Sequence, residues 1–382
     1  GDVSLVGAEG QRVGGALIVV DVDGQPGVEV LVGSWEVGTE LSSVYLLRPT
    51  EAGLVGDGSI ASIDEAEGGH RIGAIGGGSV DIDGDLQQDL IVVDYGGAYG
   101  AGRVELYLGP VAGQPVPTEA WEGDSSERGL MAEVSEDVDG DGLGELLVFG
   151  SDGGRGELWS GPLDGAAIGL GSGVYGVRSG DIDGDGLAEV GLGRPELGVA
   201  FFLEDPTADV EVEDADLVIG SDSYYGIGRS YGDLDGDGHV DLVLHNYDTA
   251  GSVWVFLGPL DADRDDASAD AWSHGSEGDK LGFDVAIVPD MDDNGTSELA
   301  ISAPGVGLGT VAVWLDAPSG ALDTETAPLR LRSPASSGFY GVRLAGGDVD
   351  GDGCAELFIG DVASTVGGAA AGELFVLLGG VL

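Results

Sequence analysis

Basic residues and cysteine are scarce in this sequence, and each scarcity narrows what the chain can do. The 382 residues include 14 lysines and arginines against 70 aspartates and glutamates, for a formal net charge of -56. Non-specific nucleic-acid binding and docking on anionic membranes both require basic patches, so we exclude both as general functions. The single cysteine, Cys354, excludes a disulfide within the chain. We expect the acidic groups to be neutralised partly by metal ions or carried on a very acidic surface.

Long apolar runs and long stretches with helical periodicity are also missing. No apolar run approaches the roughly 20 residues of a membrane-spanning helix, so we expect no membrane insertion. Short runs of valine, leucine and isoleucine alternate instead with turns of glycine and aspartate, and glycine alone contributes 74 residues. Because hydrophobic residues make up 42% of the chain and the apolar runs are regular, we do not expect disorder. The pattern indicates an all-β fold.

What the sequence has in abundance is an acidic nine-residue loop that recurs seven times. Every copy has an acidic residue at positions 1, 3 and 9, and successive copies start 44 to 60 residues apart. A period in this range is typical of a repeat architecture. Loops one to seven are DVDGQPGVE (21–29), DIDGDLQQD (81–89), DVDGDGLGE (137–145), DIDGDGLAE (181–189), DLDGDGHVD (233–241), DMDDNGTSE (290–298) and DVDGDGCAE (348–356).

Each repeat unit also carries apolar runs on both sides of its acidic loop. A glycine-bearing stretch such as YGVRLAGG (340–347) precedes the loop, and runs such as ELLVFG (145–150) and GSVWVFLGP (251–259) follow it. A more variable piece such as ADAWSHG (269–275) closes the unit. About four strands per unit is the composition of a propeller blade. The sequence therefore predicts one domain over residues 1–382, an all-β, seven-bladed β-propeller with four antiparallel strands per blade.

The two ends of the chain are expected to meet in one blade. The last unit stops after its third strand, GELFVLLGG (372–380), and Val3–Val6 resembles the fourth strand of a unit. We expect Val3–Val6 to complete the seventh blade and close the ring, which would pair strand edges otherwise exposed. The acidic tract 261–270 is the most linker-like segment. We interpret it as a loop, because the repeats continue in register on both sides.

The spacing of oxygen donors in the loops indicates a hard divalent cation. In loop four, positions 1, 3, 5 and 9 offer carboxylates and position 7 offers a backbone carbonyl. Calcium takes six to eight oxygen ligands, and glycine at position 4 or 6 lets the backbone wrap an ion. An EF-hand is excluded because position 12 is Leu192 and strands are expected on both sides. Plain acidic hairpin turns are the alternative, and their recurrence at seven equivalent places argues against it.

The repeat resembles the FG-GAP repeat of the integrin α-subunit propeller, whose blades carry D-x-D-x-D-G-x-x-D cation loops in β-hairpins. The resemblance covers essentially the whole chain, which we interpret as a bacterial-type homologue. The FG element survives as aromatic-glycine pairs and the GAP element as Ser302-Ala303-Pro304, while an Arg-Gly-Asp tripeptide is absent. The resemblance implies a calcium-binding module for adhesion or ligand recognition.

The resemblance also assigns the same ligands in every loop, namely the side chains at positions 1, 3, 5 and 9 and the carbonyl at position 7. Loop one has Gln25 in place of an acid at position 5, so we expect about seven calcium sites with loop one the weakest. The implied ligands are Asp21, Asp23, Gln25, Gly27 and Glu29; Asp81, Asp83, Asp85, Gln87 and Asp89; Asp137, Asp139, Asp141, Leu143 and Glu145; Asp181, Asp183, Asp185, Leu187 and Glu189; Asp233, Asp235, Asp237, His239 and Asp241; Asp290, Asp292, Asn294, Thr296 and Glu298; and Asp348, Asp350, Asp352, Cys354 and Glu356.

The few basic residues recur once per unit, close to the expected first strand. First strands line the central channel of a propeller, and integrin α propellers use channel aromatics to enclose a cationic side chain of a partner. One interpretation is a ligand channel, and the other is arginines paired with acids beside tyrosines that simply pack. The basic residues are Arg12, Arg71, Arg128, Arg178, Arg229, Lys280 and Arg343, and the candidate channel comprises Tyr175, Arg178, Tyr225, Arg229, Tyr340 and Arg343.

Catalytic motifs are not recognisable in the sequence. The four histidines show no metal-ligand spacing, and Cys354 lies inside an acidic loop, a poor place for a nucleophile. We therefore expect a monomeric binding module for a protein or glycan ligand rather than an enzyme. The alternative is a propeller that binds carbohydrate or cleaves polysaccharide, with some of its six tryptophans stacking on sugars.

Calcium affinity bears on the expected location. Extracellular calcium modules bind with Kd of about 10⁻⁴–10⁻³ M, which would leave such sites empty in the cytosol. At roughly 1 mM calcium and the tighter Kd, each site adds about 1.4 kcal/mol of stability. We expect a secreted, cell-surface or periplasmic protein. Because the chain begins with Gly1 rather than methionine, we also expect either removal of a signal peptide or excision from a longer protein.

Overall fold

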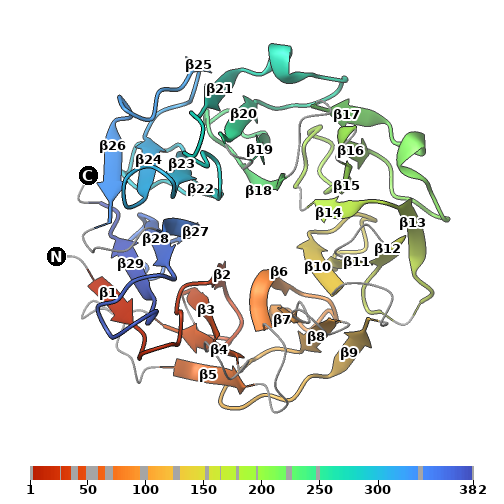
Figure 1. Ribbon diagram of the computed structural model, residues 1–382. Helices are drawn as coiled ribbons and strands as arrows, with labels where there is room; N and C mark the ends of the chain where they lie inside the picture. Colours follow the sequence, from red (N-terminus) through yellow and green to blue (C-terminus); the bar gives the residue numbers. More distant parts are fainter. Residues whose placement is uncertain are drawn as a thin grey trace.

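Seven β-sheets surround a central axis in the computed structural model of this chain, as Figure 1 shows for the described residues. The described residues are 3–25, 27–35, 42–48, 59–64, 72–94, 102–123, 130–150, 155–163, 165–177, 180–194, 197–220, 226–246, 250–333 and 339–380. Within each sheet the four blade strands pair antiparallel, with the first strand nearest the axis and the fourth at the rim (Figure 1). They follow one another in chain order in six blades, and in the seventh the fourth strand is the N-terminal one. The predicted seven-bladed β-propeller is confirmed.

The blades are numbered along the chain, and their strands coincide with the apolar runs of the repeat. Blade one holds β2 (Ala16–Val20), β3 (Glu29–Trp35), β4 (Ser42–Leu47) and β5 (Ser59–Asp64); blade two β6 (Ile72–Val80), β7 (Asp89–Asp94), β8 (Arg103–Tyr107) and β9 (Glu119–Glu122); blade three β10 (Leu130–Ser135), β11 (Glu145–Gly150), β12 (Arg155–Trp159) and β13 (Ile168–Ser172); and blade four β14 (Tyr175–Val177), β15 (Val190–Arg194), β16 (Gly198–Phe202) and β17 (Leu217–Ile219). Blade five holds β18 (Gly226–Gly232), β19 (Asp241–Asn246), β20 (Ser252–Phe256) and β21 (Ala271–His274); blade six β22 (Val285–Val288), β23 (Glu298–Ala303), β24 (Thr310–Trp314) and β26 (Leu329–Arg332); and blade seven β27 (Tyr340–Gly347), β28 (Glu356–Asp361), β29 (Glu373–Leu377) and β1 (Val3–Val6).

The N-terminal strand closes the ring as predicted. β1 pairs antiparallel with β29, with Val3 opposite Val376 and Val6 opposite Glu373. The Gly7 N–H extends the contact by donating to the Gly372 carbonyl at 3.1 Å. The first residues of the chain therefore complete the blade built by its last residues, which pairs the outer edge of β29.

The hydrophobic core is divided among the junctions between adjacent blades. Along β19, Val243 packs with residues of blade six, whereas Leu242 and Leu244 pack with blade four. Alternate side chains of a strand point to opposite faces of its sheet, so each blade buries both faces against its two neighbours. Seven such clusters of described residues occur, one at each junction of the ring.

Helical structure among the described residues is limited to two single 3-10 turns, η1 (Val212–Asp214) and η2 (Asp266–Ser268). The second turn lies within the acidic tract 261–270, which connects β20 to β21 as the predicted loop. Among the described residues, no helix has the length and apolar character needed to cross a bilayer.

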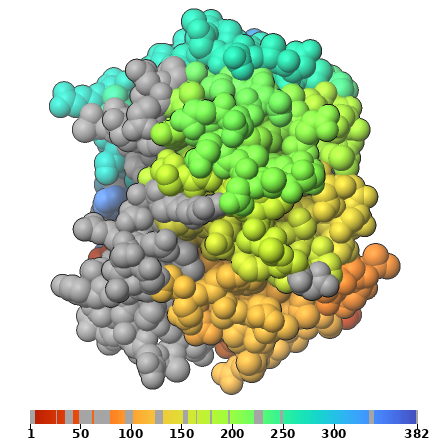
Figure 2. All heavy atoms as spheres, turned by 90° about the vertical axis from the view of Figure 1, so that its right-hand side faces the viewer, coloured from red at the N-terminus to blue at the C-terminus, as the bar shows by residue number. Residues whose placement is uncertain are grey.

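Neighbouring blades also exchange backbone contacts that the repeat pattern did not predict. A two-residue strand of the blade six chain, β25 (Gly320–Ala321), pairs in parallel with β21 of blade five. An isolated parallel bridge joins Ile219 of blade four to Arg264 of blade five. Figure 2 shows these successive blades along the wall of the ring, from blade two in orange through green to blade five in teal.

Candidate metal centres

The acidic loops occupy equivalent places in the ring. Each one connects the first strand of its blade to the second, as loop three does between β10 and β11. Successive loops contact one another at the blade junctions, as in the hydrogen bonds from the Gly144 N–H to the Asp81 carbonyl and from the Ala188 N–H to the Asp137 carbonyl, so these hairpins share one face of the ring. The seven candidate sites therefore form a circle on a single face.

The acid at position 1 holds the loop backbone in its wound shape. In loop three, Asp137 Oδ1 accepts from the Gly140 N–H at 2.7 Å and Oδ2 accepts from the Gly142 N–H at 2.9 Å. Asp141 Oδ1 accepts from the Leu143 N–H at 2.8 Å. Gly140 and Gly142 have φ of 80° and 88°, a region that favours glycine and explains the recurrence of glycine at positions 4 and 6.

The winding brings the predicted carboxylates together. In loops three and four, ligand atoms from positions 1, 3, 5 and 9 all lie within 4.8 Å of one another. Acids of loops two, five and six converge within the same distance, from positions 1, 3 and 5 in loop two and from positions 1, 3 and 9 in the other two. In loop six Asn294 replaces the acid at position 5, and its Oδ1 accepts from the Thr296 N–H at 2.7 Å. Such a concentration of oxygen donors is the environment that calcium prefers.

The acid at position 9 is buried in all seven loops, with at most 2% of Glu29, Asp89, Glu145, Glu189, Asp241, Glu298 or Glu356 exposed. In loop three, Glu145 Oε2 accepts from the Val138 N–H at 2.8 Å, yet its buried Oε1 has no hydrogen-bond partner among the described residues. The buried Glu298 Oε1 of loop six likewise has no hydrogen-bond partner among the described residues. A buried, unpaired carboxylate oxygen is costly, and a coordinated cation would satisfy it.

Burial and neighbouring charge change the acidity of these groups. Burial, with the nearby aspartates adding to it, raises the pKa of Glu145 and of Glu189 to about 8. The same causes raise the pKa of Glu298 and of Glu356 to about 7 and that of Asp241 to about 6. Full ionisation of Glu145 and Glu189 at neutral pH therefore requires a nearby positive charge, and such a charge would also favour the ionised form of the other three acids. The donor set and its buried oxygen fit a divalent cation.

Loop one is built differently, because a basic side chain reaches its acids. Arg48 follows β4, and its Nη2 donates to Glu29 Oε1 at 2.8 Å and to Asp23 Oδ1. Glu29 Oε2 accepts from the Val22 N–H at 3.0 Å. Both oxygens of the buried acid are thus satisfied within the chain.

The loops also hydrogen-bond to one another around the ring. The residue at position 8 of one loop donates its N–H to the carbonyl at position 1 of the preceding loop, as in Gly144 to Asp81 and Ala188 to Asp137, both at 2.9 Å. Ser297 to Asp233 at 3.2 Å and Ala355 to Asp290 at 3.1 Å repeat the contact. Sequence reasoning missed these residues, and their only signal is a small side chain at position 8. These hydrogen bonds therefore join the backbone of one loop to the loop of the neighbouring blade.

The candidate channel residues are placed only in part. Tyr175 packs edge-on against Phe149, with ring centroids 6.5 Å apart, and Tyr340 is 4% exposed and packs edge-on against Phe375 at 5.2 Å. The Arg343 Nη1 donates to the Val342 carbonyl at 2.7 Å. Tyr225, Arg178, Arg71 and Arg128 lie outside the described residues, and of Arg229 the structure gives only its place on β18. The ligand channel stays a prediction.

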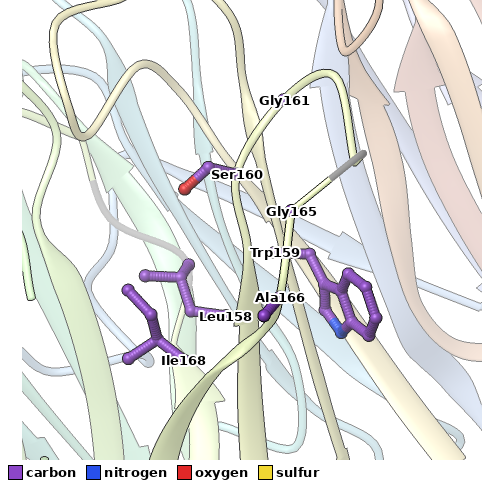
Figure 3. Close-up of a pocket in the computed structure, with 7 residues that line it drawn as sticks. All are labelled: Leu158, Trp159, Ser160, Gly161, Gly165, Ala166 and Ile168. Carbon is purple, nitrogen blue, oxygen red and sulfur yellow. The ribbon is translucent and has the colours of Figure 1, made fainter. Parts of the chain in front are cut away.

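A hollow of about 220 Å³ lies beside Trp159 at the end of β12 (Figure 3). The Trp159 indole donates to Glu157 Oε2 at 3.3 Å and packs edge-on against Trp121, with ring centroids 6.0 Å apart. The residues lining the hollow carry no charge and are Leu158, Trp159, Ser160, Gly161, Gly165, Ala166 and Ile168. The hollow is therefore a small recess with one aromatic wall among small and aliphatic residues.

Comparison with known proteins adds to this geometry. No family model matches the chain. Integrin alpha-PS5 of Drosophila melanogaster is 31% identical over 152 residues, which cover 36% of this chain and 15% of that protein. Integrin alpha-E of Mus musculus is 29% identical over 161 residues, covering 38% and 14%, and integrin alpha-D of Homo sapiens is 30% identical over 152 residues, covering 36% and 13%. The matched segment thus spans about 15% of the length of these relatives.

A solved structure shares the fold along nearly the whole chain. The structure of BBS1N in complex with ARL6DN, soaked with mercury, superposes with a TM-score of 0.51 over 98% of this chain and 94% of that one, at 9% sequence identity. At such low identity the likeness concerns the fold alone. Seven blades with repeated acidic hairpins, and a segment that aligns with integrin α subunits over about a third of the chain, make this a seven-bladed β-propeller that is integrin α-like and consistent with the FG-GAP repeat.

Proposed function

We propose that this propeller is an extracellular, calcium-stabilised module that recognises a protein or glycan ligand, with the whole chain acting as one monomeric domain. The observation that carries the calcium assignment is that one buried carboxylate oxygen of Glu145 and one of Glu298 have no hydrogen-bond partner among the described residues. In loop three, three aspartates of the same loop lie around the Glu145 carboxylate. The similarity to integrin α subunits supports adhesion or recognition as the activity.

Each ion would be held by the loop that surrounds it. In loop four, the side chains of Asp181, Asp183, Asp185 and Glu189 would face the ion, with the Leu187 carbonyl as a further donor. The ion supplies positive charge that offsets the repulsion among these acids. The chain's own residues shape the loop around the ion, since Asp181 accepts hydrogen bonds from the Gly184 and Gly186 amides at 2.6 and 2.8 Å.

The net charge of -56 sets a requirement on the ligand. A ring so acidic attracts partners with cationic surfaces and repels acidic ones. The proposed ligand is therefore a protein or glycan that presents basic groups to the ring. Bound calcium lowers this negative charge locally, on the face that carries the loops.

The carbohydrate-binding alternative has one concrete location, the hollow beside Trp159. An aromatic wall next to small residues can stack on the apolar face of a sugar. A glycan array together with an activity screen on polysaccharides distinguishes this alternative from recognition of a protein. Glycan binding that is lost in Trp159→Ala would favour it.

Calcium dependence tests the central assignment. Chelation is expected to lower the melting temperature strongly, because each lost ion leaves buried acids without counter-charge. Added calcium should restore the melting temperature and magnesium should restore it poorly, since magnesium prefers compact octahedral shells with retained water. An unchanged melting curve after metal removal verified by mass spectrometry would reject the calcium sites.

A further inference from the structure

Arg48 occupies a position that is uncharged in every other blade. The strand register places Val30 opposite Leu47, so the next pair along the two strands is Glu29 and Arg48. In the other blades, the residue opposite the buried acid at position 9, one pair beyond the end of the strand register, is a leucine or a serine. These equivalent residues are Leu108, Ser160, Leu203, Leu257, Leu315 and Leu378.

The Arg48 guanidinium bonds to two of the acids that would otherwise be metal ligands. It donates to Glu29 at position 9 and to Asp23 at position 3. The side chains of Glu29 and Asp23 are 0% and 5% exposed, whereas that of Arg48 is 31% exposed. Through charge-assisted hydrogen bonds to these two carboxylates, Arg48 makes the contacts that a bound metal ion would make.

Two prolines remove backbone donors that the other loops use. In loop three the Gly142 N–H at position 6 holds Asp137 at 2.9 Å, but position 6 of loop one is Pro26, which has no N–H. In blade two the Gly109 N–H donates to the position 9 acid Asp89 at 2.8 Å. The sequence has Pro49 at the corresponding place in blade one, so the second donor to Glu29 comes from Arg48.

We propose that the Arg48 guanidinium is the built-in counter-ion of blade one and that loop one takes no divalent cation. The inference rests on the proposed calcium sites of loops two to seven and excludes loop one from them. The protein would then bind six ions rather than seven, and blade one would stay folded at its loop when calcium is removed. The blade next to the ring closure would thereby be independent of calcium.

Hydrogen exchange of the position 2 amides tests the inference in the full-length chain. These amides donate to the position 9 acids, at 3.0 Å from Val22, 2.9 Å from Ile82 and 2.8 Å from Val138. Chelation is expected to speed exchange at Ile82 and Val138 by tenfold or more and to leave Val22 unchanged. Titration of the metal-free protein with calcium should give six bound equivalents.

Substitution of Arg48 provides the matched comparison. In Arg48→Leu, which installs the residue common at this position, the Val22 amide should become sensitive to chelation. Arg48→Lys keeps the charge and should leave Val22 insensitive, which preserves a test if Arg48→Leu folds poorly. Arg103→Leu is the control, because Arg103 pairs with Glu105 and Glu122 on blade two, away from any loop.

Two outcomes would overturn the inference, and they differ. A Val22 amide that responds to chelation in the wild-type chain as strongly as Ile82 and Val138 would show that loop one binds calcium despite Arg48. If all three amides ignore verified metal removal, the calcium sites themselves are rejected, and the contrast on which the role of Arg48 depends is lost with them.

Discussion

At the scale of the residue, the same acid can stabilise or destabilise the fold depending on what lies beside it. Asp183 belongs to a cluster of four acids, and its pKa is raised by burial and by its neighbours Asp185 and Asp181. Asp23 instead accepts from Arg48. The two acids share position 3 of their loops, but Asp23 has the Arg48 guanidinium beside it and Asp183 has further acids.

This difference predicts unlike effects of Asp183→Ala and Asp23→Ala. At 1 mM calcium, Asp183→Ala should lose about 1.4 kcal/mol of the calcium-dependent stability, the contribution of one site with Kd near 10⁻⁴ M. In chelator the same variant should be neutral or more stable, since one repelling charge is gone. Asp23→Ala should lower stability alike with and without calcium, which thermal melting in the two buffers would measure. Equal calcium-dependent losses in both variants would contradict the ranking.

The buried glutamates predict a pH dependence of stability that calcium removes. Burial raises the pKa of Glu145 and Glu189 from 4.5 to about 8, so the folded chain without calcium binds their protons more tightly than the unfolded chain does. The stability from these protons is complete below about pH 4.5 and is lost as the pH rises toward 8. Melting in chelator should therefore fall from pH 5 to pH 8, and calcium should remove the decline. Glu145→Gln should flatten part of the decline in chelator. An identical decline in calcium would argue against calcium binding at these glutamates.

At the scale of the element, short continuous apolar runs made the strands predictable. The runs ELLVFG and YGVRLAGG coincide with β11 and β27, because each blade buries both faces and thus requires apolar residues throughout. The acidic loops were equally predictable, since their glycines and aspartates are dictated by local geometry.

Contacts between distant segments left no such signal. Arg48 lies 19 residues from Glu29 in the chain, and only the pairing of β3 with β4 brings the two together. β25 consists of Gly320 and Ala321, which pair through their backbone and carry no pattern. Placing them needs the register of neighbouring blades, which the sequence alone does not contain.

The β25 contact offers a prediction about how blades five and six are joined. The hydroxyl of Ser273 on β21 donates to the Leu322 carbonyl, next to β25, at 2.7 Å, and Ser273 is buried. Ser273→Ala leaves this carbonyl without its side-chain donor, so stability should fall by about 1–2 kcal/mol. The loss should be the same with calcium and in chelator, because no acidic loop is touched. Denaturant unfolding measures both values, and a loss seen only in chelator would tie this contact to the loops instead.

At the scale of the whole molecule, stability is distributed around a ring rather than held in one centre. Seven core clusters sit at seven junctions, and position 8 amides join several loops across those junctions. A ring of this kind depends on its closure, because an open junction would expose one apolar face on each of the two adjoining blades. Closure here rests on β1, which adds the fourth strand of blade seven.

Removal of residues 1–8 therefore tests the closure directly. The truncation deletes the four paired residues of β1 and the packing of Leu5 in the cluster between blades seven and one. Loss of this pairing and burial should cost on the order of 2–4 kcal/mol. The freed edge of β29 should also recruit other chains, since an unpaired strand edge is a template for association.

Melting and size-exclusion chromatography in saturating calcium measure these two effects separately. The truncated chain should melt earlier and elute as a larger species, and a synthetic peptide of residues 1–8 added in excess should reverse both changes by occupying the edge of β29. A peptide of the same composition in scrambled order is the control, because it cannot reproduce the register of Val3 with Val376. A truncated chain that stays monomeric with an unchanged melting temperature would mean that the ring holds without its N-terminal strand, since trimming a terminus that contributes no structure is normally harmless.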